Sequence, residues 1–524
     1  MTLNSTTMSR RSIIRIHRSF LILIAALFVF PHDFAGAQDK SPSTVILNAQ
    51  VADGTGKPLR KANVRISGDR IVKIGNIKPK TNERSIDAAG LVLAPGFIDI
   101  HNHSTRGLEA DPLAETQIAQ GITTVVLGAD GFSPWPIAPW LAARRKNPAS
   151  LNLALMVGHA TIREQVMGKD YKRPATEAEV AKMTQLVDQA MGEGAIGLSS
   201  GLEYQIGGYS TTDEVVAMSG AAAKLGGFYM THIRDEADKS FDALNEEIAI
   251  GERAHIPVEH SHIKLGTVGV WNKAPEYIRI IEAARKRGLD FLADCYPYDA
   301  WESNMQVLVP DKQYENPQSV EKALADVGGA SRVTIVGFSP NPSYQGHTIE
   351  DLALLHNTTP VDMFIRIVRE GDAANTEANV IGQSMIESDI KAFYTQPWVM
   401  VASDGGIGVP HPRGAGTFPR VLGVYVREKH WLTLPDAVRK MTSLPAQRLG
   451  WKDRGVIRKG AFADLVLFSP DTVIDRSTFA KPFEVPTGIE KVFVNGQIVW
   501  ESAKATGQRP GRVLERPLAS YATK

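Results

Sequence analysis

Two histidines separated by one residue, His101 and His103, close a short apolar segment that begins after Pro95. The segment contains Phe97, Ile98 and Ile100, which predicts a short buried strand. In a strand, residues i and i+2 point to the same face. Both imidazoles can therefore bind one metal ion at the carboxyl end of this strand. The alternative is a pair of surface histidines in a turn, but the apolar run and the histidines that follow later in the chain favour a metal site.

The composition restricts what such a metal site can be made of. Cys295 is the only cysteine among 524 residues, so an intramolecular disulfide and a cysteine-rich zinc cluster are both excluded. A metal must then be bound by histidines and carboxylates. The 58 Lys and Arg residues nearly balance the 57 Asp and Glu residues, and no basic stripe stands out, which argues against nucleic acid as a partner. The length predicts more than one domain.

Residues 1–37 have the layout of a secretory signal peptide. An apolar run at 20–30 is followed by small residues at 35–37, which predicts cleavage before Gln38. The run follows a set of basic residues: Arg10, Arg11, Arg15 and Arg18. It is too short for a convincing transmembrane helix, so no stable membrane insertion is expected after cleavage. The protein is therefore expected to be periplasmic or secreted, and Ser9-Arg10-Arg11 hints at the twin-arginine route.

The two ends of the remaining chain share one pattern, and the middle has another. Short alternating strands with turns occur near 44–74 and again near 463–500, which predicts one small β-sandwich domain built from residues 38–95 and 453–524. Between them, apolar runs alternate with segments of helical period. The predicted helices span 177–193, 212–225, 241–253 and 274–287. The predicted strands span 96–103, 123–130, 151–159, 195–203, 228–232, 257–262, 290–295 and 398–404.

Eight such units predict an α/β fold, a TIM-like (β/α)8 barrel over residues 96–452. The interval between strands seven and eight is too long for one unit and predicts an insertion at about 300–395. In a barrel, the residues at the carboxyl ends of all strands converge on one mouth. The predicted ends carry His101, His103, Glu203, His232, His262 and Asp404. Imidazoles and carboxylates suit one or two zinc ions, and Asp404 is the expected proton carrier.

Several longer motifs together resemble the amidohydrolase superfamily, and within it the N-acyl-D-amino-acid deacylases, also called D-aminoacylases. They include Gly-Ala-Ile-Gly-Leu-Ser-Ser-Gly-Leu-Glu-Tyr (194–204), Thr-His-Ile-Arg-Asp-Glu (231–236), Ser-His-Ile-Lys (261–264), Ala-Ser-Asp-Gly (402–405) and His-Pro-Arg-Gly-Ala-Gly-Thr-Phe-Pro-Arg (411–420). The resemblance implies zinc-dependent hydrolysis of a small N-acyl amino acid, often the D-enantiomer. It implies metal binding by His101, His103, His232 and His262, and catalysis by Asp404.

The chain departs from this family on strand two. Many D-aminoacylases have a cysteine ligand there, whereas this chain has Gly-Ala-Asp-Gly at 128–131. Either Asp130 or Glu203 must then supply a carboxylate. We expect Glu203, because it ends strand four, where related amidohydrolases place a bridging carboxylate or carboxylated lysine. Asp130 is the alternative ligand, and it could instead only shape the glycine-rich turn.

Other polar residues near the strand ends are candidates for substrate binding. Tyr204, Arg234, Lys264 and Arg413 could hold a substrate carboxylate or pair with loop carboxylates. His159 could contact substrate or be structural, and His260 is expected to be packed. The rival functions are a cyclic amidase or a small dipeptidase of the dihydroorotase or isoaspartyl dipeptidase type, and a catalytically silent ligand-binding relative. Those enzymes commonly have a lysine where Glu203 stands, and the intact metal-ligand pattern argues against a silent protein.

Overall fold

The computed structural model describes residues 43–517. The predicted signal peptide at 1–37 lies outside the described residues, so its cleavage before Gln38 stays a prediction. Among the helices of residues 43–517, none combines the length and the apolar character needed to cross a bilayer.

A closed ring of eight parallel strands forms the centre of the structure. Its strands are β6 Phe97–Asp99, β7 Ile122–Leu127, β8 Asn152–Leu155 with β9 Val157–Gly158, β10 Leu198–Gly201, β11 Tyr229–His232, β12 Val258–His260, β13 Phe291–Cys295 and β17 Val399–Val401. β8 and β9 are two halves of one barrel strand. The Met156 N–H donates a hydrogen bond to the Leu127 carbonyl of β7, and the next N–H, that of Val157, donates to the Gly197 carbonyl just before β10. The ring closes where the His103 N–H donates to the Gly405 carbonyl at 2.7 Å. The predicted barrel is confirmed.

The helices follow their sequence signals closely. Each predicted end lies within one residue of the end observed for α5 Glu177–Gly192, α6 Thr212–Lys224, α7 Ser240–Ala254 and α8 Ala274–Lys286. At the start of α5, the Thr176 side chain accepts from the Glu179 N–H, and the Glu179 side chain accepts from the Thr176 N–H. Outside the segment between β13 and β17, the other α-helices of the described residues are α1 Gly107–Ala110, α2 Glu115–Ile118, α3 Ile137–Lys146, α4 His159–Met167, α13 Arg413–Arg420, α14 Leu434–Met441 and α15 Ser443–Arg448.

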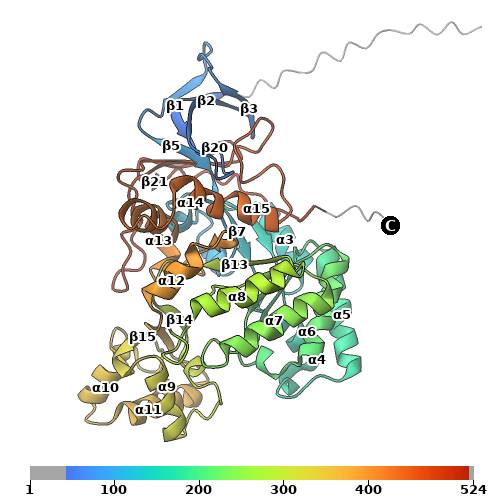
Figure 1. Ribbon diagram of the computed structural model, residues 1–524, viewed down its shortest axis with the longest axis vertical. Coiled ribbons are helices and arrows are strands. Elements are labelled where there is room, and N and C mark those ends of the chain that lie inside the picture. Colours follow the sequence, from blue (N-terminus) through green and yellow to red (C-terminus); the bar gives the residue numbers. More distant parts are fainter. Residues whose placement is uncertain (1–42, 518–524) are drawn as a thin grey trace, which may run out of the picture. The chain divides into compact units, whose positions relative to one another are not determined.

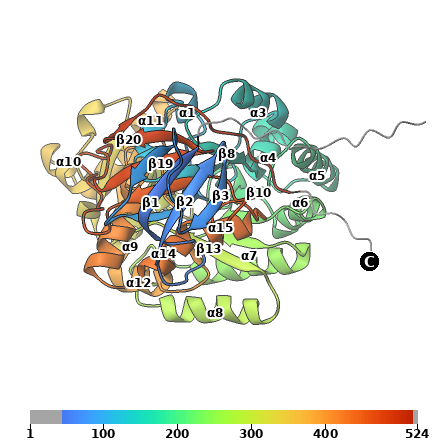
Figure 2. The same cartoon turned by 90° about the horizontal axis from the view of Figure 1, so that it is seen from above.

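The two ends of the described chain combine in one sheet, in which β5 pairs antiparallel with β18 (Figures 1 and 2). The strands are β1 Thr44–Val51, β2 Arg60–Ser67, β3 Arg70–Gly75, β4 Arg84–Asp87, β5 Val92–Pro95, β18 Leu465–Phe468, β19 Ile489–Val494, β20 Gln497–Glu501 and β21 Lys504–Ala505. Along β18, Leu465 and Leu467 enter one apolar cluster, while Val466 and Phe468 join the core of the barrel. Both faces of this strand are therefore buried, and the sheet is fixed to the barrel.

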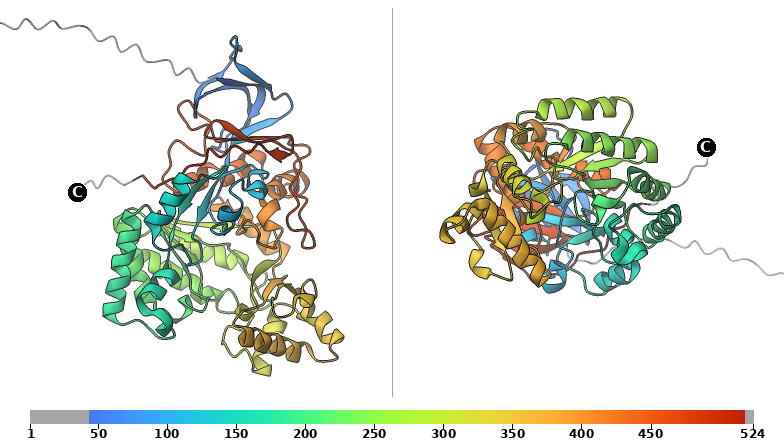
Figure 3. Two further views of the ribbon diagram at one scale, coloured as in Figure 1. Left: turned by 180° about the vertical axis from the view of Figure 1, so that it is seen from behind. Right: turned by 90° about the horizontal axis from the view of Figure 1, so that it is seen from below.

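The predicted insertion has a sheet and an apolar core of its own (Figure 3). Its elements are β14 Trp301–Asn304, β15 Val333–Gly337, β16 Asn379–Gly382, α9 Pro317–Asp326, α10 Ile349–Leu355 and α11 Pro360–Ala374. The chain then returns to the barrel as α12 Glu387–Tyr394, where the Phe393 ring lies 6.0 Å from the ring of Tyr277 in α8. β14 thus starts six residues after β13 ends at Cys295 and lies beside the barrel mouth.

Candidate metal centre

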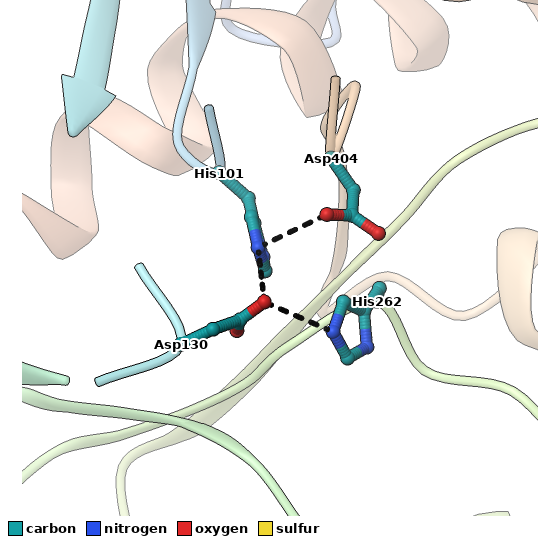
Figure 4. A group of neighbouring side chains, drawn as sticks. All are labelled: His101, Asp130, His262 and Asp404. Atoms are coloured by element: carbon teal, nitrogen blue, oxygen red, sulfur yellow. Dashed lines mark ion pairs between the residues drawn. The ribbon is translucent and has the colours of Figure 1, made fainter. Parts of the chain in front are cut away.

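Polar side chains from four strand ends meet at the mouth of the barrel. One atom from each of His101, Asp130, His262 and Asp404 lies within 4.8 Å of the others, and all four residues are buried (Figure 4). These residues follow β6, β7, β12 and β17 respectively. The barrel brings them together because the carboxyl ends of parallel strands open on one face.

The spacing of these atoms suits a small cation. Atoms bound to tetrahedral zinc at about 2.0–2.1 Å lie about 3.3–3.5 Å from one another. The Nε2 atom of His101 lies 3.3 Å from His103 Nε2, 3.3 Å from Asp404 Oδ1 and 3.5 Å from Asp130 Oδ2. His103 Nε2 lies 3.0 Å from Asp404 Oδ1 and 3.4 Å from Asp130 Oδ2. The two histidines and two carboxylates therefore surround one position with the spacing that zinc requires.

Backbone conformation turns three of these side chains into the mouth. Asp130, His262 and Asp404 have φ values of 55°, 36° and 47°, in the left-handed region that side chains other than glycine rarely adopt. Each stands two or three residues beyond the end of its strand. Because such conformations cost free energy and cluster at functional sites, their occurrence at three members of one group supports a functional centre.

Buried hydrogen bonds fix the loops that carry the group. Asp99 accepts from the Ser403 N–H at 2.9 Å and from Asn102 Nδ2 at 2.8 Å, which joins the loop of the two histidines to the loop of Asp404. Burial raises the pKa of Asp99 to about 6, although the bonds from Asn102 and Ser403 oppose this shift. On the other side, the Ser199 hydroxyl donates to the Gly128 carbonyl and accepts from the Gly131 N–H, which holds the loop of Asp130 against β10.

The charges of the group favour a cation. Burial alone would lower the pKa of His103, but Asp130 and Asp404 outweigh it and raise the pKa to about 9. The same field that stabilises a proton on this ring would stabilise a metal ion. The Oδ1 atom of Asp130 is buried and has no hydrogen-bond partner within residues 43–517. The other oxygen of this carboxylate, Oδ2, lies 3.4–3.7 Å from nitrogens of His101, His103 and His262, and a carboxylate beside three imidazoles is a donor set that zinc accepts.

A second group adjoins the first through His262. His232, Glu236 and His262 also place one atom each within 4.8 Å of the others. His232 Nδ1 lies 3.1 Å from His262 Nε2. His262 Nε2 in turn lies 3.7 Å from Asp130 Oδ2. Asp130 therefore stands between His101 and His103 on one side and the histidine pair on the other.

Glu203, which we expected to be the shared carboxylate, lies outside both groups. Its Oε2 lies 2.7 Å from His232 Nε2, so it contacts the outer edge of the second group. Asp130 occupies the shared position instead. The physical reason is the turn after β7, where glycines at 128 and 131 and the left-handed Asp130 direct its carboxylate to the centre of the mouth.

The predicted substrate-binding residues fall into different surroundings. Arg413 pairs with Asp404 at 2.7 Å, Lys264 pairs with Glu236 at 2.5 Å, and the Tyr204 hydroxyl lies 3.3 Å from His232 Nδ1. All three line the cavity at the mouth. Arg234 also lines it, but Glu246 binds its guanidinium at 2.7 and 2.8 Å.

Two other histidines face away from the mouth. His159 lies 2.9 Å from Glu214 in a buried network behind the strands and does not line the cavity. His260 is the last residue of β12 and contacts Glu247, with its ring 5.8 Å from that of Tyr277 in the helix layer. Cys295 is buried at the end of β13.

Two carboxylates that lie at the centre were not predicted as site residues from the sequence. Asp294 Oδ2 lies 3.5 Å from His101 Nδ1, and its Oδ1 accepts from the His262 N–H at 2.9 Å. Glu236 lies in the second group. The sequence contains a feature that could have indicated each of them. Asp294 is a single acidic residue within an apolar strand, and Glu236 follows the predicted ligand His232 by four residues.

The centre opens into a cavity of about 1460 Å³. One wall is aromatic and carries Phe132, Trp135 and Trp140, which follow β7. The loops after β10 and β11 and the start of the insertion also line the cavity, and they carry many of its charged side chains. The two parts of the lining meet where the Phe132 ring lies 6.4 Å from the Tyr204 ring, so apolar and polar side chains line one cavity.

The chain is similar to known proteins over most of its length. A family model described as the amidohydrolase family matches residues 84–500. D-aminoacylase of Alcaligenes xylosoxydans xylosoxydans is 36% identical, with 92% of this chain and 99% of the relative covered. A solved D-aminoacylase structure, described for its binuclear metal centre, has a TM-score of 0.81 at 35% identity, with 90% and 99% covered.

The N-acyl-D-glutamate deacylase from Bordetella bronchiseptica, solved with zinc and a phosphonate inhibitor, also has a TM-score of 0.81. It is 32% identical, with 91% of this chain and 100% of that chain covered. Because both the family model and these relatives extend over nearly the whole described chain, this protein belongs to the amidohydrolase family, in the group of the D-aminoacylases and N-acyl-D-amino-acid deacylases.

Proposed function

We propose that this protein hydrolyses the amide bond of N-acyl-D-amino acids and releases a carboxylate and a free amino acid. The observation that carries this proposal is the group of His101, His103, Asp130 and Asp404 at the barrel mouth, with ligand-atom distances of 3.0–3.5 Å. Relatives named D-aminoacylase and N-acyl-D-glutamate deacylase support the substrate class.

The donor atoms fit one zinc ion and leave room for a second. His101, His103, Asp130 and Asp404 would hold the first ion, and His232 and His262 would hold the second. Asp130 has two carboxylate oxygens and stands between the two sets, so it is the residue suited to serve both ions. When bound, zinc acidifies water and polarises the scissile carbonyl.

Asp404 would move the proton of the attacking water to the leaving amine. Arg413 and the neighbouring histidines hold the pKa of Asp404 below its usual range, although burial opposes this shift. The carboxylate is therefore ionised and ready to accept a proton at neutral pH. Its left-handed backbone and its 2.7 Å ion pair with Arg413 fix its orientation during the transfer.

The substrate's α-carboxylate would bind beside the buried cations that line the cavity. Arg413 and Lys264 supply positive charge there, and the Tyr204 hydroxyl adds a donor. Both cations are buried, with 4% and 8% of their surface exposed, so a carboxylate beside them would be screened little by water. The acyl group would then lie toward the aromatic wall of Phe132, Trp135 and Trp140.

Removal of zinc with a chelator should abolish hydrolysis of N-acetyl-D-methionine, and added zinc should restore it, because zinc would supply the acidified water and the polarised carbonyl that the reaction needs. The same assay with N-acetyl-L-methionine should give a kcat/KM at least about 100-fold lower, since inverting one carbon moves the α-carboxylate away from fixed cations. Turnover of the chelated protein at the original rate would refute the metal-dependent mechanism. Equal turnover of both enantiomers would refute the D-specific assignment.

We also propose that the chain is exported after removal of residues 1–37. The support is the basic segment, the apolar run at 20–30 and the small residues at 35–37. Mass spectrometry of the protein from a periplasmic fraction should find an amino terminus at or near Gln38. A full-length chain that remains with the cytoplasmic fraction would contradict export.

A further inference from the structure

Glu302 is a carboxylate of the cavity wall that the reaction described above does not use. It lies on β14, whose pairing with β16 places it opposite Ile381. The side chain of the neighbouring Trp301 donates from Nε1 to Ser384 Oγ at 2.8 Å. This bond adds a contact between β14 and the segment that follows β16. Glu302 is partly buried, and no side chain among residues 43–517 forms an ion pair or hydrogen bond with its carboxylate.

The surroundings of Glu302 make this lack of a partner costly. Its backbone carbonyl accepts from Arg413 Nη2 at 3.4 Å, but the Nη1 atom of Arg413 is paired with Asp404. Burial raises the pKa of Glu302, with the charge of Arg413 opposing the shift and that of Asp404 adding to it. A carboxylate held out of water next to another carboxylate is stabilised when a cation binds beside it.

Glu302 also stands on the side of the mouth that suits the amino-acid half of the substrate. It follows β13, whereas the aromatic wall follows β7, and β17 and β6 separate these two strands in the ring. Along the wall, Asp404, Arg413 and Glu302 alternate in charge. A substrate with a carboxylate on Arg413 and a positive group on Glu302 would complement this alternation.

We infer that Glu302 selects N-acyl amino acids with a cationic side chain, a guanidinium or an ammonium. This inference rests on the proposed function, because it concerns the amino-acid half of the same substrate. Glu302 would bind the charged side chain of the substrate and would take no part in making or breaking a covalent bond. The expected preference is about tenfold or more over a neutral side chain of the same shape, as a charge-assisted hydrogen bond would give.

N-acetyl-D-arginine and N-acetyl-D-citrulline form the matched pair for the test, because they differ mainly in charge. The zinc-loaded enzyme should show a higher kcat/KM for the arginine compound, and calorimetric titration should show the same order of affinities. Glu302→Gln should bring both ratios to about one, and Glu302→Lys should reverse the preference toward N-acetyl-D-glutamate. Glu164→Gln, which changes an exposed carboxylate on the same cavity, should keep the original ratios.

The two measurements separate this inference from the proposed function. Equal affinity and equal kcat/KM for the matched pair would overturn the role of Glu302, even if both compounds are hydrolysed well. Tighter binding of the arginine compound without turnover of any N-acyl amino acid would support Glu302 and refute the proposed function. Thermal melting identifies any variant that fails to fold. In that case the affinities of the unaltered enzyme for the arginine and citrulline compounds decide whether Glu302 has the proposed role.

Discussion

Asp404→Asn should lower kcat for N-acetyl-D-methionine by about 10²–10⁴-fold, the usual contribution of a general acid–base group. The amide keeps the shape of the side chain and an oxygen for the metal but accepts no proton at neutral pH. The pair with Arg413 at 2.7 Å and the contact with His103 at 3.0 Å would be weakened, so KM should rise only modestly beside the fall in kcat. Steady-state kinetics with the metal content measured by mass spectrometry would check both parts.

Asp242→Asn is the matched control for this variant, because Asp242 lines the same cavity but lies outside both metal-binding groups. It should leave kcat unchanged within about twofold, as expected for a surface substitution. If Asp404→Asn holds its zinc and still retains a tenth or more of the original kcat, another residue carries the proton and the role of Asp404 is refuted.

Asp130→Ala should weaken zinc binding by more than about 100-fold, whereas Glu203→Gln should weaken it by about 10–100-fold, the range for residues that orient a ligand. The reason is their different position. Asp130 Oδ2 lies within 3.7 Å of His101, His103 and His262, while Glu203 contacts His232 alone among the predicted metal-binding histidines. Competition with a chromogenic chelator would measure both affinities.

The stoichiometry of bound zinc gives a second readout for the same two variants. Because Asp130 lies between the two sets of histidines, its loss should reduce the binding of both ions. Glu203→Gln should affect only the ion held by His232 and His262. A Glu203→Gln enzyme that loses both ions, beside an Asp130→Ala enzyme that keeps them, would reverse the assignment and restore Glu203 as the shared carboxylate.

Most of the fold could be predicted because its signals are local. Buried parallel strands are continuous apolar runs, and the helices between them have a clear period and capping residues. The capping box of Thr176 and Glu179 marks the start of α5 within the sequence itself. The same local signals found the insertion, since no single βα unit can fill the interval from Cys295 to Trp398.

The candidate site was predictable only where a side chain lies next to a strand end. His101, His103, His232, His262 and Asp404 do so, and the structure brings all of them to one mouth. His260 illustrates the limit. Strict alternation would have placed it on the face of His262, but β12 ends at His260 and the left-handed backbone of His262 reverses the direction of its side chain.

The sequence by itself determined the class of the fold, the order of the strands and the kind of ligand, because apolar period and residue type are properties of neighbouring residues. Only the tertiary structure decided which carboxylate stands between the histidines. Asp130 and Glu203 both follow barrel strands, and no local pattern separates them. The choice depends on a left-handed turn held by Ser199 from another strand, a contact between residues that are far apart in the chain.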